Sequence, residues 1–484
     1  MVEPVIWDKC MDLMSQSEVE LIHEATLVVM GKTGLKIPLK PDLLDRVLCL
    51  GLKYDKDKDR LYFPEDIIDK ALKSAPPVYT LYSRGKGNDL IIDGKHGHLT
   101  SDGSATLFRD WNTSEIRESE MKDLEEIAIV CDYMPQISFM WPSVSARDKT
   151  TKIQPLYELR ALLLNTGKHV QAMTAVDPLN AKGTVEIARA VAGGDKALRD
   201  KPIISNFQCS VSPLSYDGKG LEAAFIFAEA GIPTGFMNMQ IGCATAPATI
   251  AGNLTMGNAE VLAGIVLLEL LYPGTPTFYG ACSTTMELTQ GGINAGNPED
   301  MQLQALNAQM ARFYNIPSNI GTFASSAKTS DWECGVKNAI SCMMSMLSKA
   351  DMMCGGGLIG CAAVFALDQM VLDCENFDLA QRTLRGIKVD AETIALDVID
   401  KVGPGGQYIK EKHTIKHLRE MWQPAILHAG SYSDWERKGK RDPIELAREK
   451  VKEILASHKP DIKQCGADID DILKTYERYA SEQE

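Results

Sequence analysis

The sequence predicts an α/β protein, a (β/α)8 or TIM barrel with a helical extension at each end. From about residue 98 onward, short apolar segments typical of strands alternate with longer segments of helical periodicity, as parallel βα units require. Eight such units over roughly 260 residues match the usual size of a closed barrel. No internal repeat or low-complexity linker divides the 484 residues into smaller domains.

The eight strand candidates are bounded by helical segments or turn residues. They are HLTSDG (98–103), ISFMWPSV (137–144), HVQAMTAV (169–176), PIISNFQCSV (202–211), PTGFMNMQIG (233–242), PTFYGACST (276–284), SNIGTFASS (318–326) and DMMCGGGLIG (351–360). A segment between the first two, EMKDLEEIAIVC, places Met121, Leu124, Ile127 and Cys131 on one helical face, which suits a helix packed on the outside of a sheet.

The extensions are predicted from helical patterns outside the barrel, which we place at residues 96–376. In residues 1–95, Val19, Ile22, Ala25 and Val28 form one apolar stripe. Residues 377–484 are expected to pack on the barrel as helices. The clearest helix start there is Asp442-Pro443-Ile444-Glu445, with an N-cap and a proline at the first helical position.

Composition and charge argue against several classes of partner. A formal net charge of −14 disfavours nucleic acid, which needs a basic face, and the run Arg437, Lys438, Lys440, Arg441 is expected to be a solvated loop. The N-terminus lacks a secretory signal, so a cytoplasmic protein is expected. The apolar stretch 261–272 contains Glu269 and is shorter than the ~20 residues that span a bilayer; a buried helix is expected.

The twelve cysteines are expected to be free thiols, because no export signal accompanies them. No C-x-x-C pair occurs, and Cys209, Cys243, Cys282 and Cys354 lie in apolar, strand-like segments, where cysteine behaves as a small hydrophobe. Many buried thiols suit a reducing cell.

The segment CGGGLIG leaves two interpretations open. Gly355, Gly357 and Gly360 satisfy G-x-G-x-x-G after an apolar strand, the pattern of a dinucleotide site, with Asp373 near the acidic position. The chain then turns helical instead of continuing with parallel strands, which disfavours that site. The alternative is that glycines at the end of the last barrel strand allow a ligand to approach closely.

Two histidine pairs give little support to a metal site. His413 and His417 are four residues apart and could share a helix face, but without a following glutamate a structural role is expected and no metal is predicted. His96 and His98 are expected in a turn. Neither a G-x-x-x-x-G-K-[ST] loop nor G-x-S-x-G occurs, so phosphoryl transfer and serine hydrolysis also lack support.

Seven separated segments resemble the trimethylamine methyltransferase superfamily of corrinoid-dependent enzymes, over residues 232–430. They are GCATAPATIAGNLTMGNAEVLAGIVLLELLYPGTPTFYGA, SSAKTSD, GGGLIG, LDQMVLDCE, LRGI, VGPGGQY and HTIKHLR. The family's trimethylamine enzymes carry pyrrolysine in the glycine-rich segment, where this chain has Gly356. The resemblance therefore implies the branch without pyrrolysine, which demethylates quaternary amines such as glycine betaine, proline betaine or carnitine, with Gly356 and Gly357 at the catalytic position.

The chemistry gives this branch a physical reason. A quaternary nitrogen already leaves as a neutral amine, so the enzyme needs only to exclude water and hold the N-methyl group in line with a nucleophilic Co(I). The resemblance implies that a corrinoid (cobalamin) supplies this reactivity. This chain has no D-x-H-x-x-G cobalt-ligand motif, so the corrinoid is expected on a separate protein that docks at the barrel mouth, with Gly356 and Gly357 leaving room above the substrate.

A quaternary ammonium calls for aromatic faces. The candidates near predicted strand ends are Trp141, Phe207, Tyr279 and Phe323, each of which could equally be a core residue; Phe207 and Tyr279 are the preferred pair. Lys328, just past a strand end, is the candidate anchor for a betaine carboxylate, with a surface ion pair as its alternative.

Three functions follow from these features. The first is a quaternary-amine:corrinoid methyltransferase, with glycine betaine as the favoured substrate, no cofactor bound by this chain itself, and a homo-oligomeric assembly. The second is a barrel that binds a betaine without catalysis, and the third is a nicotinamide-dependent oxidoreductase using Gly355–Gly360. Neither nucleic acid nor membrane is expected as a partner.

Overall fold

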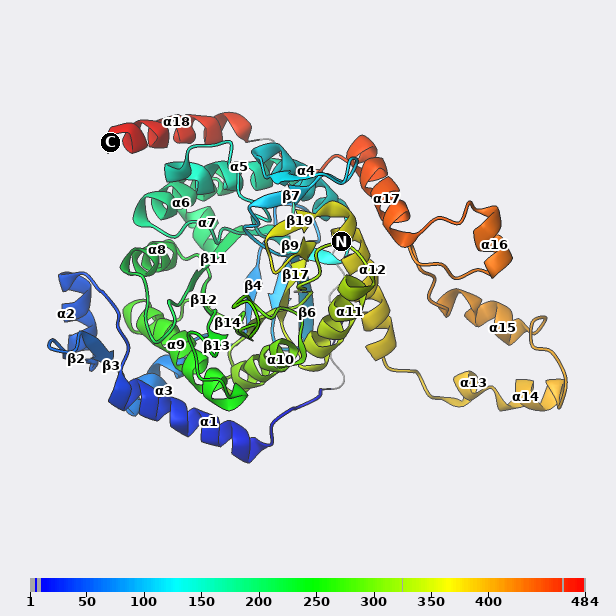
Figure 1. Cartoon of the computed structure of the whole chain (residues 1–484), viewed down its shortest axis with the longest axis horizontal. Helices are drawn as coiled ribbons and strands as arrows, with labels where there is room; N and C mark the ends of the chain where they lie inside the picture. Colours follow the sequence, from blue (N-terminus) through cyan, green and yellow to red (C-terminus); the bar gives the residue numbers. More distant parts are fainter. Residues whose placement is uncertain (1–4, 7–9, 324, 464, 483–484) are drawn as a thin grey trace.

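Eight parallel strands close into a barrel in the computed structural model, which describes residues 5–6, 10–323, 325–463 and 465–482. The barrel closes because β6 pairs with both β17 and β9 (Figure 1). All eight predicted strand segments are confirmed as barrel strands. In chain order these are β6 (His96–Ser101), β9 (Ile137–Met140), β10 (His169–Gln171), β11 (Ile204–Cys209), β12 (Thr234–Asn238), β14 (Tyr279–Ala281), β16 (Ser318–Gly321) and β17 (Met352–Gly356).

A ring of helices surrounds the strands, as the α/β barrel prediction requires (Figure 1). The predicted apolar face of the first one, α4, is buried. The ring consists of α4 (Met121–Tyr133), α5 (Gln154–Asn165) preceded by the 3-10 turn η2 (Thr151–Ile153), α6 (Pro178–Ala192) with α7 (Asp195–Asp200), α8 (Gly218–Glu229), α9 (Ile250–Leu271), α10 (Pro298–Phe313), α11 (Trp332–Leu347) and α12 (Leu367–Leu384).

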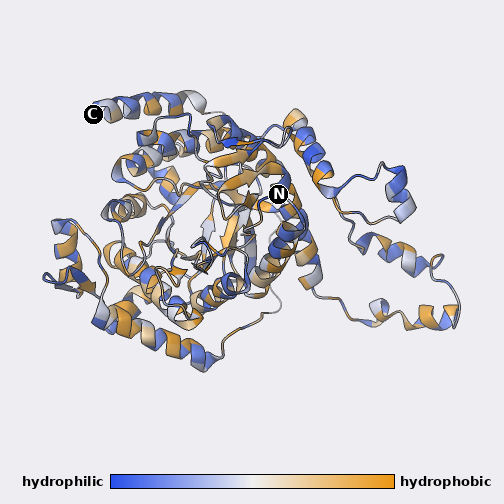
Figure 2. Ribbon diagram, viewed as in Figure 1, coloured by the Kyte–Doolittle hydropathy of each residue, from blue (hydrophilic) through white to orange (hydrophobic). Residues whose placement is uncertain are grey.

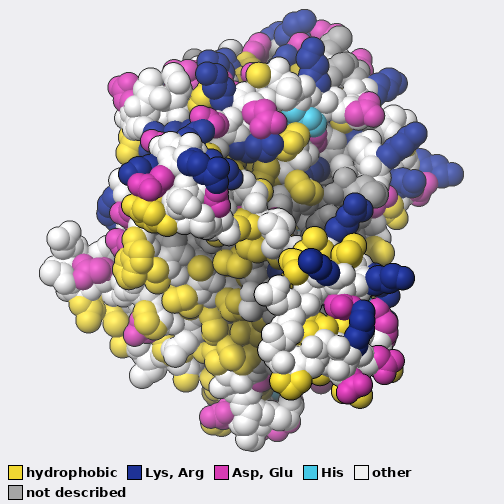
Figure 3. Space-filling view, turned by 90° about the vertical axis from the view of Figure 1, so that its right-hand side faces the viewer, with side chains coloured by type: hydrophobic (Ala, Val, Ile, Leu, Met, Phe, Trp, Pro, Cys, Tyr) yellow, Lys and Arg dark blue, Asp and Glu magenta, His cyan; other side chains and the backbone are white. Residues whose placement is uncertain are grey.

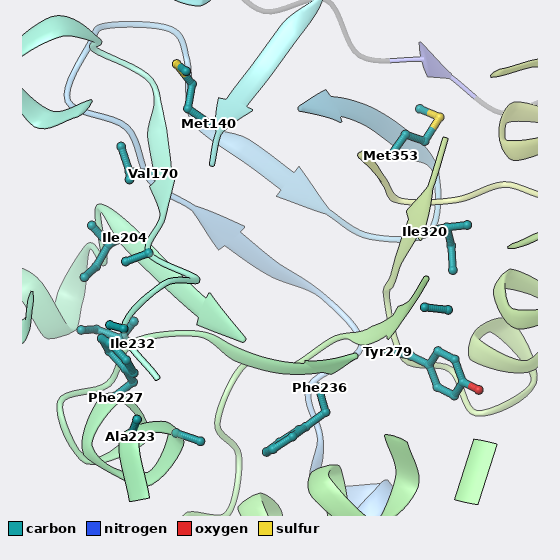
Figure 4. Packing of buried hydrophobic residues seen from close by; sticks show 14 of the residues in the cluster. Met140, Val170, Ile204, Ala223, Phe227, Ile232, Phe236, Tyr279, Ile320 and Met353 are labelled. Atoms are coloured by element: carbon teal, nitrogen blue, oxygen red, sulfur yellow. The ribbon is translucent and has the colours of Figure 1, made fainter. Parts of the chain in front are cut away.

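Alternate strand residues separate into two apolar clusters. Outward residues pack against the helices, and Figure 4 shows Met140, Phe236, Tyr279 and Met353 pointing from the strands toward that layer. A second cluster is built from the opposite faces of the strands and fills the barrel interior; its strand-derived members are Phe139, Trp141, Phe207, Met237, Phe278, Met352 and Cys354.

The N-terminal end of the barrel is closed by a hairpin of β4 (Tyr79–Leu81) and β5 (Leu90–Ile92), whose apolar side chains join the interior cluster. His98 contacts the carbonyl of Ile91 at 3.1 Å, and His169 contacts the carbonyl of Tyr82 at 2.8 Å. His96 and His98 thus belong to strand β6; the predicted turn was wrong, since burial of alternate side chains selects the strand. Access to the interior is left at the C-terminal end.

Residues before the barrel form more than helices. Helix α1 (Gln16–Val28) begins at a capping box between Ser15 and Glu18, and α1 and α3 both pack on α9. The remaining elements are β1 (Val5–Ile6), the π-helical turn η1 (Val29–Thr33), α2 (Pro41–Cys49), the hairpin β2 (Lys53–Asp55) with β3 (Arg60–Tyr62), and α3 (Glu65–Ser74). Two hairpins are therefore present in a segment that was expected to be helical.

Helix α9 is the one described helix long and apolar enough to cross a membrane, and 83% of its most apolar window is buried inside the protein. It lies in the barrel ring, so its apolar surface packs against protein. Glu269 on this helix accepts hydrogen bonds from Ser74 and from the Gly274 amide. The predicted buried helix is confirmed.

Short strands follow the barrel strands beyond their C-terminal ends. β18 (Leu358–Ile359), β19 (Val364–Ala366), β7 (Leu107–Arg109) and β8 (Ile116–Glu118) form one small sheet, and β13 (Ile241–Gly242) pairs with β15 (Thr284–Thr285).

The C-terminal residues divide into a packed part and a projecting part. Helix α17 (Pro443–Ser457) packs on α12 and α4, and α18 (Gly466–Glu482) packs on α6 and α5; α17 begins at the predicted Asp442 cap. Between α12 and α17, the elements α13 (Ala391–Ile394), α14 (Leu396–Val402), α15 (Lys412–His417), η3 (Leu418–Glu420) and α16 (Tyr432–Arg437) extend away from the barrel (Figure 1). This part was expected to pack on the barrel; it contacts α12 through Glu420, Ala425 and Leu427, but its elements from α13 to α16 bury no residue.

Candidate active site

The candidate site lies inside the C-terminal end of the barrel, where catalytic residues of such barrels gather. Four side chains at strand ends there keep partial exposure although they pack on or beside the interior cluster: Asp102, Met173, Cys209 and Cys282. Because the β4–β5 hairpin closes the opposite end, a ligand reaches these groups through the mouth.

Aromatic rings form one wall of the interior. The rings of Trp141 and Phe207 lie 5.0 Å apart at 47°, and Phe207 meets Phe278 edge-on at 6.1 Å. Trp141 directly follows β9 and is 2% exposed, and its buried Nε1 has no hydrogen-bond partner among the described residues. Such a wall offers π faces to a poorly hydrated cation.

Asp102 supplies the negative charge of this site. It directly follows β6, and its amide donates to the Gly356 carbonyl at 3.3 Å, which joins the end of β6 to the end of β17. Its carboxylate accepts a hydrogen bond from the Gly103 amide at 2.8 Å. Burial raises the pKa of Asp102 to about 6, and no cation of the described residues offsets this shift. A positively charged ligand would therefore find an unpaired acid here.

Three thiols lie in or against the interior cluster, and one of them, Cys354, lies near the Asp102 carboxyl group. Burial raises the pKa of Cys209 to about 12, and the pKa of Cys354 is raised by a hydrogen bond with Cys282, by burial and by the charge of Asp102. Neutral thiols are weak nucleophiles. Cys209, Cys282 and Cys354 are buried or half-buried in apolar surroundings, as the sequence predicted, whereas Cys243, for which the same was predicted, is exposed.

Two of the four predicted aromatic residues lie together in the interior and two do not. Trp141 and Phe207 form the wall, whereas Tyr279 and Phe323 belong to the outer cluster. The Tyr279 hydroxyl contacts Asn258 on α9 and Asn307 on α10. The preferred pair of Phe207 with Tyr279 was thus wrong by one residue: Phe278 is the inward neighbour, because successive strand side chains face opposite sides.

Lys328 does not lie in this site. Its side chain is exposed, and its Nζ donates to the Ser326 carbonyl at 2.6 Å. No contact of Lys328 joins it to the aromatic wall among the described residues. The position of Lys328 therefore gives no support to its predicted role of binding a betaine carboxylate.

The two glycines border the site through their backbone only. A Cβ on Gly356 would face Met370 of α12 at 3.2 Å, and one on Gly357 would overlap the Phe365 ring at 2.6 Å. Gly357 also has a φ of +88°, which favours glycine. The expected room above the substrate is absent at these two Cβ positions, since both point into packed protein.

The dinucleotide interpretation does not match the geometry. A fingerprint of that kind runs directly from a strand into a helix, but here β18 and β19 follow β17 and α12 begins only at Leu367. Asp373 is buried on α12, where it accepts hydrogen bonds from the Gly357 amide and from Asn338. Burial raises its pKa to about 7. It is a structural group within the helix layer.

The histidine pair of α15 has protein partners. His413 contacts the Glu392 carbonyl at 3.2 Å, and His417 lies between the carboxylates of Glu392 and Glu420, each at 2.8 Å. Glu392, His413 and His417 place ligand atoms close enough for a metal ion, but Lys416 already pairs with Glu392 at 2.5 Å. These contacts are those of the structural role that the sequence predicted.

Asp102, Phe278 and Met173 were missed as site residues. Asp102 follows a strand directly, which was a readable signal, whereas Phe278 required the register of β14. Met173 lies against Gly103, where an added Cβ would be 2.5 Å from its sulfur.

A family model described as trimethylamine methyltransferase (MTTB) matches residues 3–482. The chain belongs to the trimethylamine methyltransferase family. The match covers the barrel and both extensions, and it confirms the resemblance found in the sequence. The family is one of methyltransferases, so the chain is placed among transferases and not among oxidoreductases.

Several curated relatives of this family member span nearly the whole chain. Trimethylamine methyltransferase MttB of Methanosarcina thermophila is 30% identical over 466 residues, covering 95% of each chain. The MttB of Desulfitobacterium hafniense is 30% identical over 447 residues, covering 92% of this chain and 90% of its own. The glycine betaine methyltransferase of Desulfitobacterium hafniense is 28% identical over 452 residues, covering 93% of each.

A solved structure confirms the fold. The Methanosarcina barkeri monomethylamine methyltransferase aligns with a TM-score of 0.51 at 13% identity, covering 90% of this chain and 92% of its own. At this identity the likeness extends to the barrel architecture alone.

Proposed function

We propose that this member of the trimethylamine methyltransferase family demethylates a small quaternary amine in the cytoplasm. The methyl acceptor in this proposal is the reduced Co(I) corrinoid of a separate protein. The single observation that carries the proposal is the aromatic wall of Trp141, Phe207 and Phe278 beside the unpaired Asp102, inside a barrel closed at its other end.

The reaction needs no acid or base from the protein. A corrinoid presented by the separate protein would supply the electron pair that accepts the methyl group. The bond from the methyl carbon to nitrogen breaks, its electron pair stays on nitrogen, and a neutral tertiary amine leaves. What this chain contributes is position and exclusion of water.

The residues of the mouth fit these two tasks. Aromatic faces attract a quaternary ammonium by roughly 0.5–2 kcal/mol each. For a substrate without a carboxylate, an ionised Asp102 adds an opposite charge in a poorly hydrated place. The thiols and Met173 leave few groups that hold water. Because the pKa values of Cys209 and Cys354 are raised, these two thiols stay neutral and do not compete for the methyl group as thiolates would.

Asp102 also bears on the choice of substrate. A betaine carries a carboxylate that an ionised Asp102 repels, so glycine betaine, proline betaine or carnitine binds best when Asp102 is protonated. A compound with only positive charge, such as choline, binds best when Asp102 is ionised. Affinity therefore falls with rising pH through about 6 for betaines and rises for choline. We retain glycine betaine as the first substrate to test, because one relative bears that name.

The test combines the purified chain, a reduced corrinoid protein and one amine at a time. Glycine betaine, proline betaine, carnitine, choline and trimethylamine are compared by the loss of Co(I) absorbance. We expect methylation with a quaternary amine and none with trimethylamine. Methylation with trimethylamine alone, or with none of them, contradicts the proposal.

Calorimetry separates the enzyme from a non-catalytic binding barrel. Tight binding of a betaine with no methyl transfer to any corrinoid protein would support the binding barrel, which Gly356 at the pyrrolysine position had suggested.

A further inference from the structure

An extended arm, residues 385–441, leaves the barrel wall after α12 and returns at α17 (Figure 1). None of its helical elements, from α13 to α16, contains a buried residue. Segments held together by a core bury apolar side chains, and segments of this length without one are rarely stable alone. We therefore expect a surface outside this chain to cover the apolar side chains of the arm.

The arm is fixed to the barrel at its base and near its middle. The Glu420 carbonyl accepts a hydrogen bond from Arg382 at 2.8 Å. Farther along, the amides of Ala425 and Leu427 donate to the Glu375 carboxylate of α12, and Ile426 is buried. The stretches on either side of these attachments reach into solvent, so the arm is anchored and yet uncovered.

Apolar side chains are concentrated on this uncovered part. Figure 2 shows them along α13 and α14, far from the strands. Ile387, for example, is 87% exposed. Eleven large apolar residues of the arm are exposed: Ile387, Val389, Ile394, Leu396, Ile399, Tyr408, Ile409, Ile415, Leu418, Met421 and Tyr432.

Exposed apolar area on this scale marks an interface. Burying these eleven side chains removes roughly 60–120 Å² of apolar surface for each. The total area exceeds the largest apolar patch that a monomer usually exposes. Two copies that bury such arms reciprocally reach the size class of obligate homodimers, which are more apolar than transient complexes.

The charges of the arm argue against a membrane or a nucleic acid. Residues 385–441 contain eleven Lys or Arg and eight Asp or Glu. Several of these charges are paired within the arm, as in Lys388 with Asp390, Lys401 with Glu411 and Lys416 with Glu392. The basic run near the end of the arm is also paired, as in Arg437 with Asp434, Lys440 with Glu436 and Arg441 with Glu449. A net charge of +3, eleven basic minus eight acidic residues, on a surface paired in this way has little attraction for a polyanion.

The barrel presents apolar surface on the side from which the arm leaves. Trp332 and Ile340 of α11 and Leu379 of α12 are exposed, Trp332 by 82%, and α11 and α12 pack against each other. Figure 3 shows hydrophobic side chains gathered over this side of the molecule, bordered by charged ones. The arm extends outward from this side, so its far part cannot cover the surface of its own chain.

We propose that the arm is an exchange arm, which lies on the α11–α12 side of a second copy of this chain. A two-fold axis then places each arm on the other copy, as a closed symmetric dimer requires. The barrel mouth is another face, because the arm leaves the barrel wall sideways in the view down the barrel (Figure 1). This inference does not depend on the proposed reaction.

The first test measures mass in solution. We expect wild-type protein at micromolar concentration to have twice the 53.1 kDa of one chain by sedimentation or light scattering. The double variant Ile409→Asp/Ile415→Asp should be monomeric, with dimer affinity lowered at least 100-fold. Both side chains are exposed, so the fold should survive, which circular dichroism checks.

A matched control places the same charge elsewhere. Leu21 on α1 is 64% exposed and lies outside the arm, so Leu21→Asp should stay dimeric. A monomeric wild-type protein, an arm variant that remains dimeric, or dissociation of Leu21→Asp to the same extent would each overturn the proposal.

Cross-linking tests where the arm lies. Copies labelled with ¹⁴N and ¹⁵N are mixed, exchanged and treated with an amine cross-linker. We expect mixed-label links from Lys410 or Lys412 of one copy to Lys337 on α11, or to Lys349 just after it, of the other. A dimer without such links, or an arm that becomes protected only when a corrinoid protein is added, would overturn the exchange.

Discussion

At the scale of single residues, the candidate site depends on which way each side chain faces. Trp141 and Phe207 meet in the interior at 5.0 Å, while Tyr279 faces α9 and α10 through its hydroxyl. Neighbouring residues of a strand face opposite sides, so one can line the interior while the next one packs in the outer core. Substitutions on the two faces should therefore affect different properties.

Trp141→Ala should weaken substrate binding without unfolding the barrel. Loss of one cation–π face costs roughly 0.5–2 kcal/mol, so KM for the quaternary amine should rise about 2- to 30-fold, and Trp141→Phe should recover part of the loss. Steady-state methyl transfer measures both.

Tyr279→Phe is the control for this prediction. It removes hydrogen bonds to Asn258 and Asn307, which should lower the free energy of unfolding by about 1 kcal/mol and leave KM unchanged. Equal effects of the two substitutions on KM would contradict the assignment of faces.

Asp102→Asn should stabilise the free protein at neutral pH. The pKa of Asp102 is raised from 3.8 to about 6 by burial, so ionisation costs stability as pH rises from about 4 to 6. The asparagine variant escapes this cost, which is at most about 3 kcal/mol. Urea unfolding at pH 8 should favour the variant, and at pH 4 the two proteins should converge. The pH dependence of amine binding near 6 should also disappear in the variant.

At the scale of elements, the end of β17 is shaped by glycines that act differently. Gly355 and Gly357 have φ values of +129° and +88°, and an added Cβ on Gly355 would lie 2.5 Å from the Thr322 carbonyl oxygen. Gly356 has no positive φ, and a Cβ there would meet the unbranched end of the Met370 side chain. The segment is thus a packed strand end and not an open loop.

Gly357→Ala and Gly356→Ala form a matched pair for this element. The first forces a Cβ into the Phe365 ring at a positive φ and should lower the free energy of unfolding by about 1–3 kcal/mol. The second meets the end of the Met370 side chain at 3.2 Å and the Thr100 carbonyl oxygen at 3.4 Å, and should cost under about 1 kcal/mol. Thermal unfolding measures both, and equal losses would contradict this packing.

At the scale of the whole molecule, the barrel interior is closed at its N-terminal end. The β4–β5 hairpin seals the N-terminal end through its apolar side chains and through hydrogen bonds to His98 and His169. Burial lowers the pKa of both histidines to about 4. The seal is therefore formed by neutral imidazoles.

His169→Gln should make stability less sensitive to acid. The folded pKa of His169 lies below the usual 6.5, so its contribution is complete above pH 6.5 and is lost as pH falls toward 4, by up to about 3 kcal/mol. Glutamine does not titrate. Unfolding curves at pH 7.5 and pH 5 should show a smaller loss for the variant, and parallel losses would argue against a neutral, buried imidazole.

The sequence by itself determined the barrel, its eight strands, the buried helix α9 and the cap of α17, because these depend on local periodicity and on residues close in the chain. It also determined the family. Tertiary structure alone decided that Phe278 and not Tyr279 faces inward, that Asp102 stands beside the aromatic wall, and that residues 385–441 project from the barrel. Which side chains face inward depends on the register that the strands adopt when the barrel closes. The arm projects because the described surface of this chain does not cover it. A local sequence pattern determines neither of these features.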